Sequence, residues 1–155
     1  MTTTAQTQER RRDPQEIVDA VVEQRKKTFE AYCVLGGVAT PAQATEGLKA
    51  DITPLALKDF LNLMVDYTAT GQFTLYQRII EGKERRGAVR EIADKIYPSI
   101  GETTDALVEF NDKYEGYDGA SDDQQALRED LSRLGEVLAI RGELEDEILQ
   151  AMISR

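Results

Sequence analysis

The chain of 155 residues contains no histidine. Its absence excludes Ser-His-Asp and Cys-His catalysis, in which an imidazole moves the proton. The common zinc sites and the Glu-x-x-His ligands of di-iron helical bundles are excluded for the same reason. The sequence also has no glycine-rich phosphate loop of the Walker or dinucleotide type. We therefore expect a protein that is not an enzyme and that holds neither a metal nor a cofactor.

Cysteine, tryptophan and long apolar runs are equally scarce. Cys33 is the only cysteine, so the chain has no internal disulfide and a reducing cytoplasm is the expected compartment. No apolar run approaches the roughly 20 residues that cross a bilayer, and no apolar segment follows the basic cluster near the N-terminus. Tryptophan is absent and aromatic residues make up only 6% of the chain, so aliphatic side chains must fill most of the core.

The acidic residues are unevenly distributed. The net charge is −10, yet residues 1–50 and residues 51–100 each carry seven basic and seven acidic side chains. Residues 101–155 carry five basic and fifteen acidic side chains, so the whole excess lies in the last third. Such a field repels nucleic acid and attracts basic proteins. A role in solubility alone explains the charge equally well at this point.

The N-terminal third predicts a tail followed by a long helix. Residues 1–12 are polar and without periodicity, and we expect a disordered tail before a helical domain that covers residues 13–155. Asp13 is the expected N-cap, with Pro14 at the first helical position and Glu16 at the third. Apolar residues follow at helical spacing until the glycine pair 36–37.

The middle of the chain predicts a loop and two helices. The loop covers residues 36–52, and the next helix begins with Thr53 as N-cap and Pro54 at its first position. Gly71 is expected to end this helix. A shorter, separate helix should then begin at Phe73 and end near Gly82.

Two further regions complete the predicted fold. A short helix is expected at residues 89–96, and Pro98 should separate it from another helix that ends near Tyr114. Ser121 should cap the longest helix, whose apolar face repeats at intervals of three and four residues. We therefore expect an all-α, single-domain antiparallel helical bundle of about four main helices plus short ones.

Charged residues interrupt the apolar faces of the first and last helices. Arg25, Arg141 and Glu145 stand where the periodicity predicts apolar side chains, and Arg141 and Glu145 are four residues apart. Gly142 beside them costs a helix interior about 1 kcal/mol relative to alanine. With Asp146, these residues predict either a structural ion pair between helices or a polar pocket.

Three stretches of the chain carry recognisable motifs: the amphipathic opening helix, a central block with a Val-Asp-Tyr motif followed by a glycine turn, and the closing helix. The residues of the central block are Val65, Asp66, Tyr67, Gly71, Phe73 and Tyr76, and those of the closing helix are Leu131, Gly135, Leu138, Arg141, Leu144, Glu145 and Asp146. In these residues the chain resembles the anti-sigma factors of the regulator-of-sigma-D (Rsd/AlgQ) family. The resemblance spans about residues 14–152.

This resemblance implies a partner. Members of the family bind the C-terminal, promoter-recognising region of the housekeeping sigma factor, a basic helix-turn-helix domain, and block its contacts with core RNA polymerase and promoter DNA. Asp66, Phe73 and Tyr76 are the implied contacts, and the acidic side chains of Glu143 and Glu147 are the expected electrostatic footprint. No direct contact with nucleic acid or membrane is expected, and a second regulatory partner is left open.

Several alternatives stay open from the sequence. Asp66 is equally explained as an idle surface carboxylate, Phe73 and Tyr76 as core residues, and Glu143 with Glu147 as a solvated face. A different class of function is a small-ligand or signalling sensor. Its pocket would be built from Arg25, Arg141, Glu145 and Asp146.

Overall fold

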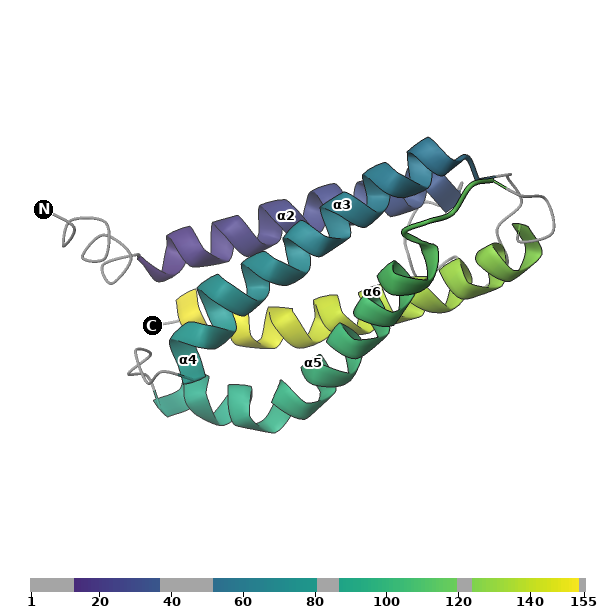
Figure 1. Ribbon diagram of the computed structural model, residues 1–155. Helices are drawn as coiled ribbons and strands as arrows, with labels where there is room; N and C mark the ends of the chain where they lie inside the picture. Colours follow the sequence, from purple (N-terminus) through teal and green to yellow (C-terminus); the bar gives the residue numbers. More distant parts are fainter. Residues whose placement is uncertain (1–12, 37–51, 81–86, 120–123, 154–155) are drawn as a thin grey trace, which may run out of the picture.

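A computed structural model describes residues 13–36, 52–80, 87–119 and 124–153, and these residues are helical apart from short connecting segments. The helices are α2 (Pro14–Gly36), α3 (Pro54–Thr70), the π-helical turn η2 (Gly71–Tyr76), α4 (Gln77–Ile80), α5 (Gly87–Tyr114) and α6 (Gln124–Ile153). Figure 1 shows the long helices as an up-and-down bundle. The expected all-α antiparallel bundle is confirmed. The expected tail, the loop segment 37–51 and the Ser121 cap lie outside the described residues.

The neighbours in the bundle are fixed by helix packing. α2 packs on α3 and α6, while α5 packs on α6 and α3. α3 and α6 therefore occupy diagonal positions, as do α2 and α5 (Figure 1). The core is mainly aliphatic, as expected from a chain without tryptophan, and contains Leu57, Leu75, Leu107, Leu127, Leu131 and Leu138. Among the described residues, no helix is both long and apolar enough to cross a membrane.

The start of α3 follows the predicted capping. The Thr53 side chain accepts a hydrogen bond from the Ala56 backbone N–H at 3.2 Å, and Pro54 occupies the first helical position. Asp13 caps α2 in the same way, because its carboxylate accepts from the Gln15 N–H at 3.1 Å. α2 is described to Gly36, and the second glycine of the predicted stop lies outside the described residues.

Two predicted helix breaks are wrong. Gly71 keeps a right-handed helical conformation (φ −59°, ψ −47°), and the chain continues through η2 into α4. Pro98 lies inside α5, which runs unbroken from Gly87 to Tyr114 and bends in its N-terminal part (Figure 1). An interior proline costs about 3 kcal/mol. Ile96 and Ile100 are both buried, so the segments on either side of Pro98 are held by the core.

Candidate functional site

The interruptions in the apolar faces come together as a buried polar cluster, defined here as Arg25, Tyr67, Arg141, Glu145 and Asp146. Arg141 and Glu145 on α6 are almost inaccessible to solvent. Arg141 Nε lies 3.7 Å from Glu145 Oε2. The Tyr67 hydroxyl, from α3, donates a hydrogen bond to Glu145 Oε1. The predicted ion pair between these residues of α6 is therefore present in the centre of the bundle.

Further contacts hold the Arg141 guanidinium between three helices. Its Nη1 donates to the hydroxyls of Thr103 at 3.0 Å and Thr104 at 2.8 Å, both on α5. Its Cζ lies 5.4 Å from the centre of the Tyr67 ring. Arg141 thus links α6 to α5 and α3.

Arg25 connects α2 to the same cluster. Its Nη1 lies 2.8 Å from Asp146 Oδ1 and 3.7 Å from Glu145 Oε1, and it donates to the Gly142 carbonyl at 3.3 Å. Asp146 is half-exposed, so this edge of the cluster reaches solvent. Two arginines therefore face two carboxylates, which limits the cost of burying their charges.

Two glycines line this cluster at close range. A Cβ built on Gly71 would lie 3.5 Å from Tyr76 Cε2 and 3.6 Å from Arg141 Nη2. A Cβ on Gly142 would lie 3.5 Å from the Phe29 ring. Gly142 therefore marks the approach of α2 to α6.

Burial governs the ionisation of the cluster. It raises the pKa of Glu145, and the favourable interactions with Arg141 and Tyr67 offset this only in part. Burial also raises the pKa of Tyr67 and of the neighbouring Tyr76, so both phenols stay protonated near neutral pH. A protonated Tyr67 is the form that can donate to Glu145.

Three surface pockets are lined by residues that the structure describes. Arg25, Arg141 and Glu145 line none of these three pockets. Among the described residues there is also no group of three or more side chains suited to hold a metal ion. The contacts of the cluster thus favour the structural ion pair over a ligand pocket.

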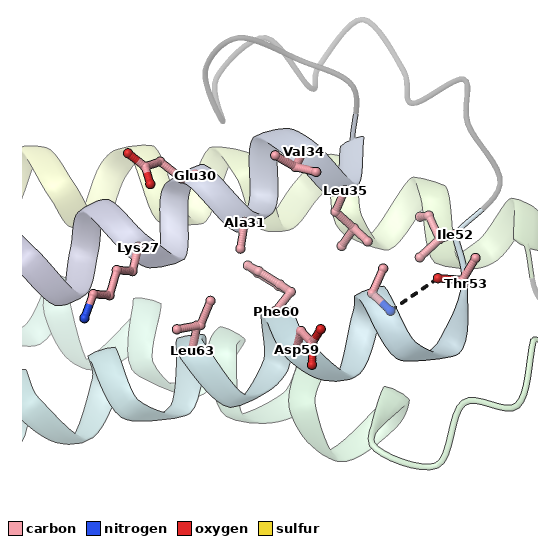
Figure 2. A pocket seen from close by; sticks show the side chains of 11 residues that line it. Lys27, Glu30, Ala31, Val34, Leu35, Ile52, Thr53, Asp59, Phe60 and Leu63 are labelled. Atoms are coloured by element: carbon pink, nitrogen blue, oxygen red, sulfur yellow. Dashed lines mark hydrogen bonds between the residues drawn. The ribbon is translucent and has the colours of Figure 1, made fainter.

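The largest of these three hollows, the α2–α3 pocket, holds about 620 Å³. Figure 2 shows Phe60 and Leu63 of α3 pointing toward Ala31 of α2 across it. Its charged lining residues are of both signs, namely Lys27, Glu30 and Asp59. This pocket therefore carries little selectivity for the charge of a partner.

A second hollow, the α3–α5 groove, has a different character. It holds about 350 Å³ and is lined from α3 and η2 by Met64, Val65, Thr68, Ala69, Gln72 and Phe73, and from α5 by Thr104, Leu107, Val108 and Asn111. Phe73 is 69% exposed and Val108 48% exposed, although both are large and apolar. Contiguous exposed apolar surface of this kind is typical of protein interaction sites.

Comparison with known proteins supplies the family. Residues 1–153 match the family model described as regulator of RNA polymerase sigma(70) subunit, Rsd/AlgQ. The chain belongs to the Rsd/AlgQ family. It is 29% identical over 136 residues to the regulator of sigma D of Yersinia enterocolitica, an alignment that covers 87% of this chain and 79% of the relative. It is 30% identical over 141 residues to that of Shigella dysenteriae, covering 91% and 86%. No solved structure matches the chain.

The residues that the Rsd/AlgQ resemblance implies as contacts differ in exposure. Asp66 and Phe73 are exposed, so the alternative that Phe73 belongs to the core is wrong. Tyr76 is only 1% exposed and packs edge-on against Tyr97, with 6.0 Å between ring centres. Tyr76 is therefore buried too deeply to contact a partner as expected.

The acidic residues of α6 lie on another side of the Rsd/AlgQ bundle. Glu143 and Glu147 are exposed, as expected, but each stands two positions from the buried Glu145. Two residues correspond to a rotation of roughly 200° about a helix axis. Because Glu145 faces Tyr67 of α3, Glu143 and Glu147 point away from α3. The structure therefore does not bring them together with Asp66 and Phe73.

Other acidic residues border the α3–α5 groove. Asp105 and Asp112 are exposed on α5, one turn before and one turn after Val108. Helical periodicity in the sequence did not identify these residues as part of a site. A usable signal was present, because residues 96–112 contain four acidic side chains and no lysine or arginine. What the sequence lacked was the information that α5 packs beside α3.

Proposed function

We propose that this Rsd/AlgQ-family chain is an anti-sigma factor that acts by binding and not by catalysis. Its partner is the C-terminal, promoter-recognising region of the housekeeping sigma factor, and binding blocks the contacts of that region with core RNA polymerase and promoter DNA. Family membership over residues 1–153 is the observation that carries this proposal. The net charge of −10 supports it, since a domain that recognises DNA is basic.

The exposed surface of α3 is consistent with such a partner. Asp66 and Phe73 are both exposed side chains of the helical run from Pro54 to Ile80. An exposed aromatic residue and an exposed carboxylate combine an apolar anchor with a charge that selects basic partners.

A binding assay with two forms of the sigma factor tests this proposal. The purified chain should bind full-length housekeeping sigma factor and should not bind a form truncated before its C-terminal region. It should also reduce binding of the sigma factor to core RNA polymerase. Equal affinity for the intact and truncated forms would overturn the assignment of the C-terminal region.

A further inference from the structure

The apolar groove between α3 and α5 is bordered by charge of one sign. Its lining residues fall within residues 64–73 of α3 and η2 and residues 104–111 of α5. Exposed acidic residues in or next to these segments include Asp66 on α3 and Asp105 and Asp112 on α5, and residues 64–73 and 104–112 contain no lysine or arginine. This distinguishes the groove from the α2–α3 pocket, whose lining includes Lys27.

The apolar part of the groove is exposed on both walls. Phe73 and Val65 are exposed on the α3–η2 wall, and Val108 is exposed on the α5 wall. Leu107 and Met64 form the buried floor between them. An apolar groove between two helices accepts the apolar face of a third helix, with side chains spaced at i, i+3, i+4 and i+7.

We propose that the α3–α5 groove binds a single amphipathic, basic α-helix of the sigma factor's C-terminal region. The apolar face of that helix lies on Met64, Leu107 and Val108, and Phe73 packs against it as the aromatic anchor. Lysine or arginine side chains flanking its apolar face pair with Asp66 on one wall and with Asp105 and Asp112 on the other. This proposal rests on the proposed function and adds the surface and the shape of the bound segment.

Substitutions in the groove, each with a matched control, test this placement. Phe73→Ala should weaken binding of the purified sigma C-terminal region at least tenfold, or about 1.4 kcal/mol. Leu55→Ala is its control, because Leu55 is 70% exposed at the other end of the same helical run. Val108→Arg should abolish binding, because it fills the groove and repels a basic helix. Ile140→Arg, at a residue of α6 that is 51% exposed, should change affinity less than threefold.

A photo-crosslinking amino acid at position 108 tests the shape of the bound segment. Cross-links should fall on residues of one sigma helix at helical spacing, with lysine or arginine beside them. Cross-links to a loop would overturn the proposal, and so would groove variants that bind as tightly as their controls. In both cases binding by the wild type would leave the anti-sigma function standing. If the folded wild type fails to bind the sigma region at all, the function and the groove proposal fall together.

Discussion

Within the polar cluster, Glu145 depends on the hydroxyl of Tyr67. The two oxygens of this buried carboxylate differ, since Oε1 accepts from Tyr67 while Oε2 has no hydrogen-bond partner among the described residues. The hydroxyl of Tyr76 is buried and likewise has no such partner. A buried polar group stabilises a fold when its hydrogen bond is made and destabilises it when the bond is missing. The two tyrosines should therefore respond oppositely to loss of their hydroxyls.

We expect Tyr67→Phe to lower the free energy of unfolding by about 1–3 kcal/mol, because it removes a donor from a buried carboxylate. Tyr76→Phe should be neutral or stabilising, since it removes a buried hydroxyl that makes no hydrogen bond within the described structure. Urea unfolding followed by circular dichroism measures both. Equal destabilisation by the two substitutions would show that the Tyr76 hydroxyl has a partner, such as a buried water.

Some residues of the site could be predicted from the sequence and others could not. Arg25, Arg141 and Glu145 were predictable because a charge in an apolar stripe conflicts with the helical period. The exposure of Phe73 and the burial of Tyr76 were not predictable in this way. Both depend on η2, whose π-helical turn changes the angular spacing of the residues that follow.

At the scale of helices, the sequence predicted the first residue of a helix better than it predicted the last residue. The caps at Asp13 and Thr53 depend on local hydrogen bonds, and the structure contains both. The predicted breaks at Gly71 and Pro98 failed because burial of neighbouring residues outweighs the local preference. The sequence also did not show which helices pack against each other. The acidic residues of α5 could therefore not be assigned to the groove from the sequence.

The contact between α5 and α6 includes a carboxylate that should make stability depend on pH. Burial opposes ionisation of Asp130, but hydrogen bonds from Lys113, at 2.7 Å, and from the Tyr114 hydroxyl outweigh it and lower its pKa. A lowered pKa in the folded state stabilises the protein above the ordinary value of about 3.9. This contribution is lost as the pH falls through the lowered pKa.

We therefore expect Asp130→Asn to cost about 1 kcal/mol of unfolding free energy at neutral pH. The difference from the wild type should begin to shrink below about pH 4 and should vanish below the lowered pKa of Asp130, where the wild-type carboxylate is also protonated. Urea unfolding across a pH series measures it. Glu136→Gln, at an exposed position of the same helix, serves as the control. A difference that stays constant down to acidic pH would assign the effect to packing instead of charge.

Across the whole molecule, two acidic surfaces are candidates for attracting a basic partner. One is the α5 wall of the groove with Asp105 and Asp112, and the other is the outer face of α6 with Glu143 and Glu147. They lie on different sides of the bundle, yet both contribute to its net charge of −10. Long-range attraction raises the association rate, and salt screens it over about 8 Å at physiological ionic strength.

Two double variants separate these surfaces, because each removes two negative charges and leaves the same net charge. At physiological salt, Asp105→Asn with Asp112→Asn should slow association with the sigma C-terminal region several-fold, while Glu143→Gln with Glu147→Gln should change it little. At about 0.01 M salt the screening length reaches roughly 30 Å, so the two variants should become similar. Stopped-flow kinetics over a salt series measures both rates. If the α6 variant is instead the slower one at physiological salt, the partner approaches the outer face of α6. An association rate that does not respond to salt in the wild type would mean that the acidic residues serve solubility and that apolar contacts guide binding.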